Sequence, residues 1–344
     1  MSQVSAVVGA VPNPGGPFRA GPYRGPMSDS HLFKSTLPES WTGRVDGPNP
    51  DHALWSTTVR PMDDPASVDP GVALIGFASD EGITRNYGRA GAADGPDAIR
   101  TSLGFMSVHD ERPRYDAGTI TVDGHDLEGA QDTLADAVST IAKAGHLPVV
   151  LGGGHEAAWG SYRGLHEATG GDASSIAIIN LDAHLDLRQA EPCNNGTPFR
   201  QVSELAGDDF NYSVLGVSPT DNTKFLFDSA RERGVNITTD DQLSELSPTE
   251  AADLAVKVTD GRERIHLSID LDVLHAAVCP GVTSPASVGV PLANIRAICT
   301  ALAKTGRLAL VDVVELSPPL DVDKRTARVA SRLVEEITAA HATA

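Results

Sequence analysis

The chain has 344 residues, of which 40% are hydrophobic and 21% charged, a composition typical of globular proteins. Its formal net charge of −19 argues against nucleic acid and anionic membrane surfaces as partners, because both attract basic patches. The three cysteines have no C-x-x-C spacing and no apolar run approaches the ~20 residues of a membrane span, so we expect a soluble, cytoplasmic protein.

Residues 1–68 are rich in Pro, Gly, Ser and Asp and show little hydrophobic periodicity. We interpret this segment as a mobile or loosely packed N-terminal leader, which could pack onto the body through Leu37, Trp41 and Trp55. After it, short apolar runs alternate with longer amphipathic stretches, a pattern typical of βαβ units and a parallel sheet. The sequence therefore predicts one α/β catalytic domain over residues 69–344.

Seven apolar runs are predicted as strands, at residues 72–78, 147–153, 176–183, 212–218, 235–239, 265–272 and 308–316. Seven amphipathic stretches are predicted as helices, at residues 96–106, 127–144, 156–168, 223–233, 248–258, 291–304 and 325–340. Pro248 and Pro291 suit the first turn of a helix. Gly145, Gly234 and Gly306 fall where helices should end.

Three of the predicted strands run into residue types that bind metal ions. A histidine follows three glycines after the second strand, a D-x-H-x-D sequence follows the third, and a D-x-D sequence ends the sixth. Residues two apart in an extended chain point to the same face, and parallel strands present ligands at their carboxyl ends. We therefore expect six side chains to converge: His155, Asp182, His184, Asp186, Asp270 and Asp272.

Each motif alone has an ordinary structural explanation. A histidine after a glycine-rich turn is usually a loop residue, and a D-x-D sequence at a strand end often caps the next helix. The D-x-H-x-D sequence is more informative, because two acids and a histidine at a buried strand end are costly unless they are paired or bound to metal. Three such motifs at three equivalent positions favour a metal centre.

The ligand types indicate which metal and what chemistry to expect. Two histidines and four aspartates, without a thiolate, form a hard, oxygen-rich set that favours Mn²⁺ over Zn²⁺, Fe²⁺, Co²⁺ and Ni²⁺. Four carboxylates carry enough charge for two divalent ions. A dinuclear site of this kind can bridge a water molecule, lower its pKa and deliver hydroxide at neutral pH. The residues themselves thus predict a two-metal hydrolase.

The sequences GGGH at 152–155, DAHLD at 182–186 and SIDLD at 268–272 resemble the arginase/agmatinase/formimidoylglutamase family of ureohydrolases, over residues 72–340. The resemblance implies a three-layer α/β/α fold around a mostly parallel eight-stranded sheet, and a homo-oligomer, usually a trimer or hexamer. It also implies two Mn²⁺ per chain. One ion would be held by His155, Asp182, Asp186 and Asp270, and the other by His184, Asp182, Asp270 and Asp272, with Asp182 and Asp270 bridging.

Within this family, the chain most resembles the formimidoylglutamases. Residues 80–100 and 194–202 are similar to that branch, and His275 replaces the third acid that arginases and agmatinases carry after the last motif. By the same resemblance, Phe199 takes the position of the histidine proton shuttle of arginases. Asn294 takes that of the glutamate that pairs with their guanidinium substrate. Both differences argue against an arginase or agmatinase.

The implied reaction is hydrolysis of N-formimidoyl-L-glutamate to L-glutamate and formamide, a step of histidine breakdown. The resemblance makes Asp186 the catalytic residue that hydrogen-bonds the attacking hydroxide and passes on its proton. The two substrate carboxylates call for arginine, which binds them through bidentate contacts. Arginines near the motifs can equally form surface salt bridges. The candidates for substrate binding are Arg200 as first choice, then Arg85, Arg89 and Arg188, with Asn195 beside them.

Two other functions stay open from the sequence. One is a ureohydrolase acting on another guanidino or formimidoyl acid, as in guanidinobutyrases or agmatinases. The other is a metal-binding subunit without activity. The intact set of six ligands argues against the inactive subunit, which would have no reason to retain four converging acids.

Overall fold

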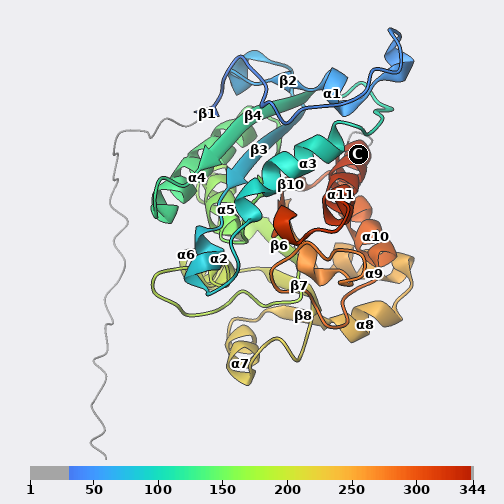
Figure 1. Cartoon of the computed structure of the whole chain (residues 1–344). Helices are drawn as coiled ribbons and strands as arrows, with labels where there is room; N and C mark the ends of the chain where they lie inside the picture. Colours follow the sequence, from blue (N-terminus) through green and yellow to red (C-terminus); the bar gives the residue numbers. More distant parts are fainter. Residues whose placement is uncertain (1–30, 342–344) are drawn as a thin grey trace, which may run out of the picture.

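The computed structural model describes residues 31–341, so sequence predictions about residues 1–30 lie outside the described part of the chain. A single sheet crosses the molecule (Figure 1), and eight of its strands are parallel to one another. They are β3 (Val72–Ala78), β4 (Arg114–Thr121), β5 (Leu147–Gly152), β6 (Ile176–Leu181), β7 (Tyr212–Val217), β8 (Asn236–Thr239), β9 (Arg264–Asp270) and β10 (Leu308–Val314).

Two short strands extend this sheet at one edge. The strand β1 (His31–Leu32) pairs antiparallel with β4, and β2 (Arg60–Pro61) pairs parallel with the same strand. The order across the sheet is β1-β4-β3-β5-β10-β9-β6-β7-β8. The predicted mostly parallel eight-stranded sheet is therefore confirmed, with two added two-residue strands.

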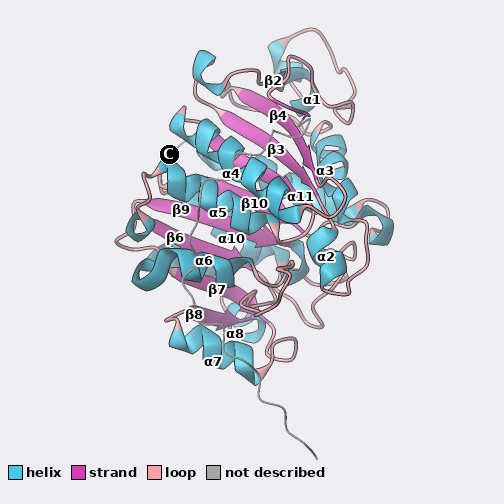
Figure 2. Ribbon diagram, turned by 90° about the vertical axis from the view of Figure 1, so that its left-hand side faces the viewer, coloured by secondary structure: helices cyan, strands magenta, loops and turns pink. Residues whose placement is uncertain are grey.

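Helices cover both faces of the sheet, which confirms the predicted three-layer α/β/α fold. Figure 2 looks onto the face that carries α4 (Leu127–Lys143), α5 (Ala157–Ala168) and α6 (Pro198–Ala206). The opposite face carries α3 (Gly95–Leu103), α9 (Pro248–Lys257), α10 (Leu292–Ala303) and α11 (Arg325–His341). The remaining helices are α1 (Trp55–Thr58), α2 (Glu81–Arg85), α7 (Lys224–Glu232) and α8 (Asp240–Glu245).

The alternation of side chains along each strand builds two separate hydrophobic cores. In β3, Val72 and Leu74 join the core beneath α3, α10 and α11, whereas Ala73, Ile75 and Phe77 join the core beneath α4 and α5. Both faces of the sheet are covered, so the strands read as continuous apolar runs rather than as alternating ones. This is why the sequence pattern identified most of them.

The strand β4 was missed because its sequence, RYDAGTIT, contains charged residues. Asp116 in this strand accepts hydrogen bonds from Arg100 of α3, at 2.7 Å from Nε to Oδ2 and 3.0 Å from Nη2 to Oδ1. Arg100 also donates to the carbonyl of Gly118. Because this buried pair satisfies both charges, a strand with a poor hydrophobic pattern can still lie inside the protein.

Part of the predicted leader packs against the domain. Trp55 is fully buried in the core beneath α3 and α11, its Nε1 donates to Glu335 of α11, and its ring stacks on Trp41 with centroids 6.2 Å apart. Leu37 is half-buried. The position of the boundary at residues 68/69 stays a prediction.

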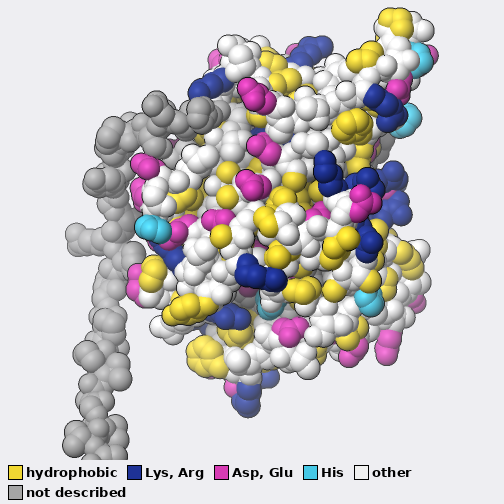
Figure 3. All heavy atoms as spheres, viewed as in Figure 1, with side chains coloured by type: hydrophobic (Ala, Val, Ile, Leu, Met, Phe, Trp, Pro, Cys, Tyr) yellow, Lys and Arg dark blue, Asp and Glu magenta, His cyan; other side chains and the backbone are white. Residues whose placement is uncertain are grey.

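Acidic and basic side chains are interspersed on the face of the molecule shown in Figure 3. No helix between residues 31 and 341 is long and apolar enough to cross a membrane.

Candidate metal centre

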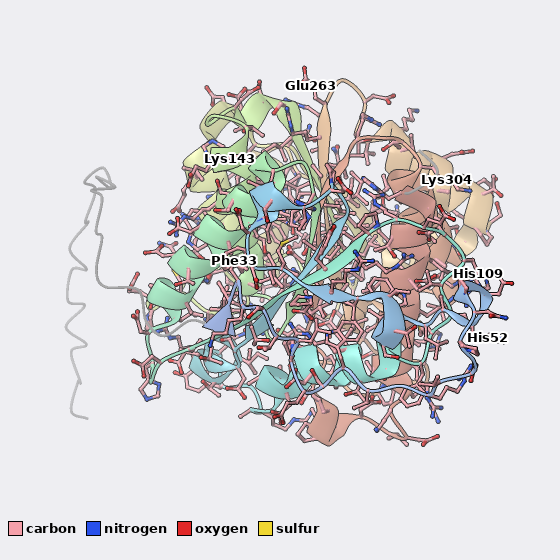
Figure 4. The ribbon with its side chains drawn as sticks, turned by 90° about the horizontal axis from the view of Figure 1, so that it is seen from above. Phe33, His52, His109, Lys143, Glu263 and Lys304 are labelled. Atoms are coloured by element: carbon pink, nitrogen blue, oxygen red, sulfur yellow. The ribbon has the colours of Figure 1, made fainter. Side chains whose placement is uncertain are left out.

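Four adjacent strands of the sheet, β5, β10, β9 and β6, carry the candidate site at their carboxyl ends. Each strand contributes at least one buried ionisable side chain at its end or within three residues beyond it, where ligands bind in open parallel sheets. The structure brings all six sequence-predicted residues together at this edge. Two other histidines, His52 and His109, lie at the rim of the molecule (Figure 4), outside the cluster.

The first group of ligand atoms surrounds the Nδ1 atom of His155. This atom lies 3.2 Å from Oδ2 of Asp182, 2.9 Å from Oδ2 of Asp186 and 3.2 Å from Oδ2 of Asp270. It is buried and has no hydrogen-bond partner in the described part of the chain, while the other ring nitrogen, Nε2, is hydrogen-bonded to Ser268 at 3.0 Å. An unpartnered imidazole nitrogen among three carboxylate oxygens is the environment that a divalent cation fits.

The second group surrounds the Nδ1 atom of His184. It lies 3.0 Å from Oδ2 of Asp272 and 3.5 Å from Oδ1 of Asp182. Asp182 therefore places one oxygen in each group, as a bridging carboxylate must. Asp270 reaches the first group with Oδ2, and its Oδ1 accepts a hydrogen bond from the backbone N–H of Asp272 at 2.9 Å.

Local backbone contacts fix these side chains. The backbone N–H of His184 donates to Oδ1 of Asp182 at 2.6 Å, which turns the chain sharply as it leaves β6. Asn180 donates to the other oxygen of Asp182 at 2.9 Å. Asp186 has a φ of 47°, a left-handed conformation that is uncommon outside glycine and clusters at functional sites.

The carboxylates at this site carry more negative charge than the two histidines beside them can neutralise. Burial, reinforced by Asp272 and Asp182, holds the pKa of Asp270 well above its usual range. Burial also raises the pKa of Asp272 to about 7, although His184 opposes the rise. Burial lowers the pKa of His155, but the carboxylates around it outweigh burial and raise that pKa well above its usual value. Cations at this position would relieve the repulsion among the acids.

Sequence reasoning missed one buried carboxylate at the site, Glu315, which directly follows β10. Its Oε1 accepts hydrogen bonds from the backbone N–H of His155 at 2.9 Å and from Nδ2 of Asn195 at 3.0 Å. Its Oε2 accepts from the hydroxyl of Thr283 at 3.1 Å. Glu315 also has a positive φ, of 69°. Its place at a strand end, in the run VVEL, is the signal that could have identified it.

A second missed carboxylate, Glu156, lies directly after His155 and supports the loop that begins at β3. Its Oε1 accepts from the hydroxyl of Ser79 at 2.7 Å and from the backbone N–H of Gly82 at 3.0 Å. Burial and the nearby charge of Glu315 raise the pKa of Glu156 to about 7. Glu156 thus ties the start of α2 to the turn that carries His155.

The interpretation of Asn294 as the counterpart of a substrate-pairing glutamate is wrong. Its side chain is buried on α10, where Nδ2 donates to the carbonyls of Leu243 and Leu246 at 2.8 and 2.9 Å. A glutamate whose carboxylate does contact His155 is Glu315. Phe199 is fully buried, and its ring packs edge-on against the imidazole of His155 with centroids 5.4 Å apart.

The exposed side chain of His275 is not among the clustered ligand groups. It follows the end of β9 by five residues, past the turn that holds Asp272.

The four candidate arginines differ in their contacts. Arg85 is paired with Glu81 at 2.9 Å and with Glu128 at 2.6 Å. Arg200 is paired with Glu204 at 2.5 Å, one turn along α6.

Among residues 31–341, the other two candidates have no acidic partner. Within this range Arg89 donates only to the carbonyl of Thr283, at 3.2 Å. Arg188 is exposed, and its guanidinium makes no hydrogen bond or ion pair with any residue between 31 and 341. The role of all four in substrate binding stays a prediction.

Comparison with known proteins identifies the family of this chain. The family model described as the arginase family matches residues 70–340. The chain is 62% identical to the formimidoylglutamase of Corynebacterium efficiens, over 91% of this chain and 98% of the relative, and 46% identical to that of Rhodococcus opacus, over 87% and 95%. It also resembles a crystal structure of Trypanosoma cruzi formiminoglutamase with Mn²⁺, with a TM-score of 0.73 and 29% identity over 80% of this chain and 94% of that one.

Proposed function

The chain belongs to the arginase family, and we propose that it is a manganese-dependent hydrolase that converts N-formimidoyl-L-glutamate and water to L-glutamate and formamide. The observation that carries this function is the buried pair of ligand groups that share Asp182, in a chain 62% identical to a formimidoylglutamase over nearly its whole length. The same reaction places the enzyme in histidine breakdown.

The cofactor is two Mn²⁺ per chain. His155, Asp182, Asp186 and Asp270 would hold one ion, and His184, Asp182 and Asp272 the other, with Asp270 as a further bridge. The unpartnered Nδ1 of His155 and the oxygen-rich donor set fit such ions. When bound, the two ions supply a water molecule of lowered pKa and polarise the amidine.

Asp186 is the residue that takes a proton from the attacking water. Its carboxylate lies 2.9 Å from Nδ1 of His155, among the first group of ligand atoms, where it can hydrogen-bond the attacking water. The water oxygen ends in formamide as the bond between the amidine carbon and the glutamate nitrogen breaks. The proton held by Asp186 passes to that nitrogen, so that atoms and charge balance.

Glu315 binds the cationic amidine. It is buried beside the ligand groups, and its charge contributes to the raised pKa of Asp272, so it lies within electrostatic reach of the metal ligands. A buried carboxylate next to a delocalised cation forms a charge-assisted hydrogen bond. That contact orients the amidine carbon toward the attacking water.

Arg188 is the leading candidate for binding the carboxylates of the substrate. It lies two residues after Asp186, its backbone N–H donates to the carbonyl of Gly196, and its guanidinium is free to bind an anion. Arg89 is a further candidate, whereas the amide of Asn195 donates to Glu315. Arg85 and Arg200 would each have to release an acidic partner first.

The setting of this activity follows from charge and family. A cytoplasmic homo-oligomer, a trimer or hexamer, that binds neither nucleic acid nor membranes fits the charge of −19 and the cysteine pattern.

The test of the proposed function is a panel of formimidoylglutamate, arginine and agmatine with the Mn²⁺-loaded protein. Formamide release from formimidoylglutamate should be fastest. Faster turnover of agmatine, which has no carboxylate, would contradict the assignment.

A further inference from the structure

The carboxylate of Glu315 is almost fully occupied by the protein itself. A carboxylate offers about four lone-pair positions to hydrogen-bond donors. Oε1 accepts from the backbone of His155 and from Nδ2 of Asn195, and Oε2 accepts from Thr283. These three bonds leave one position open, on Oε2. Glu315 can therefore accept one hydrogen bond from a substrate without losing a bond to the protein.

The side-chain amide of Asn195, which donates to Oε1 of Glu315, is fixed by a second asparagine. Nδ2 of Asn86 donates to Oδ1 of Asn195 at 2.9 Å, which turns the amide NH₂ group of Asn195 toward Glu315. The backbone around it is also tightly packed: a Cβ at Gly82 would lie 2.9 Å from the backbone nitrogen of Asn195. Asn195 is thus a fixed donor rather than an adaptable one.

The number of open positions distinguishes two head groups. A formimidoyl group has one terminal nitrogen, and the hydrogen on its carbon does not donate a useful hydrogen bond. A guanidino group has a second terminal nitrogen, an NH₂ group, in place of that hydrogen. With one open position, the carboxylate satisfies the single terminal nitrogen of the first group but leaves the second NH₂ of a guanidino group unpaired. An unpaired polar group in a buried site is penalised.

We propose that Asn195, held by Asn86, is a specificity-determining residue that fills the second acceptor position on Oε1 of Glu315 and so selects formimidoyl over guanidino substrates. This inference rests on the proposed function, because it assumes that Glu315 faces the amidine. Asn195 acts through Glu315 and is a positioning residue rather than a catalytic one.

Two matched substrates isolate the head group. N-formimidoyl-L-glutamate and N-amidino-L-glutamate share the glutamate tail and differ only by the extra NH₂. Both release L-glutamate on hydrolysis, so a single glutamate assay gives kcat/KM for each. Where the amidino compound is not turned over, its inhibition constant against formimidoylglutamate replaces kcat/KM in the comparison.

The variants are Asn195→Ala and Asn86→Ala, with Asn236→Ala as control. Asn236 is an exposed asparagine on β8 whose Nδ2 donates to the hydroxyl of Ser213. We expect Asn195→Ala to shift the preference toward the amidino compound by roughly 10-fold or more, because it opens a second acceptor position. Asn86→Ala should shift it in the same direction but less, and Asn236→Ala should leave it unchanged.

The outcomes separate this inference from the proposed function. If the wild type releases no glutamate from formimidoylglutamate, the proposed function is wrong. If it does, and Asn195→Ala keeps its manganese but shows the wild-type preference, the specificity role of Asn195 is overturned while the function stands. Should Asn195→Ala fail to fold, the preference of Asn86→Ala decides alone: an unchanged ratio overturns the role and a shifted ratio supports it.

Discussion

The backbone N–H of His155 donates to Oε1 of Glu315 at 2.9 Å, which links the candidate metal centre to the carboxylate that we propose binds the amidine. The two residues follow β5 and β10, which are neighbours in the sheet. This hydrogen bond therefore joins the turn after β5 to the carboxyl end of the neighbouring strand β10. Rigid placement of this kind orients a substrate for attack.

Changes to one ligand group should empty one metal position preferentially. His184→Ala and Asp272→Ala remove side chains that reach only the second group, so manganese should fall from about two ions to about one ion per chain. Asp182→Ala, which removes an oxygen from both groups, should lower occupancy of both. Metal analysis of the purified proteins measures this, with His52→Ala at the rim as control. Equal loss from all three ligand variants would argue against two distinct positions.

The stabilising effect of manganese should grow with pH. In the metal-free protein, Asp270 and Asp272 have raised pKa values, about 7 for Asp272. Their contribution to stability is therefore present at low pH and lost as pH rises through those values. Mn²⁺ binds the deprotonated form and offsets this loss.

Thermal unfolding with Mn²⁺ and with a chelator, at pH 6 and pH 8, measures the effect. The rise in Tm caused by Mn²⁺ should be larger at pH 8. An equal or larger rise at pH 6 would show that the raised pKa values of these carboxylates do not govern the response.

Substitution of Arg188 should weaken substrate binding without loss of metal. Losing a charge-assisted contact to a carboxylate costs about 2–4 kcal/mol, or roughly 30- to 1,000-fold in kcat/KM. If the contact is equal in the ground and transition states, Arg188→Ala should raise KM with little change in kcat. Arg200→Ala is the matched comparison, and it should have a small effect because Arg200 is already paired with Glu204. The reverse result would restore Arg200 as the binding residue.

The described part of the leader should contribute to stability rather than to metal binding. Trp55 is fully buried, and replacing a buried tryptophan by alanine costs about 3–5 kcal/mol. Trp55→Ala should therefore lower the free energy of unfolding by that amount while the protein still binds two Mn²⁺. Tyr87→Ala, at a side chain that is 99% exposed, is the control. Loss of both metals from a folded Trp55→Ala protein would contradict a boundary near residue 69.

Residues with a conspicuous local sequence pattern could be predicted, whereas residues brought together only by the fold could not. The six predicted metal-binding residues were identifiable because acids and histidines at the ends of buried strands are conspicuous. Glu315 was missed because it is a single acid after an apolar run, and only the pairing of β10 with β5 brings it to His155. The sequence ranked Arg200 first among the arginines, but Arg200 is paired with Glu204. The pairing of Arg85 with Glu128, 43 residues away in the sequence, could not be foreseen either.

Titration of the metal-free protein with Mn²⁺ while following formamide release from N-formimidoyl-L-glutamate tests the two-metal hydrolase most directly. Activity should be absent without metal and should rise to a plateau at about two equivalents per chain, with one formamide released for each glutamate formed. Full activity in thoroughly metal-stripped protein, or a plateau at one equivalent, would contradict the dinuclear mechanism.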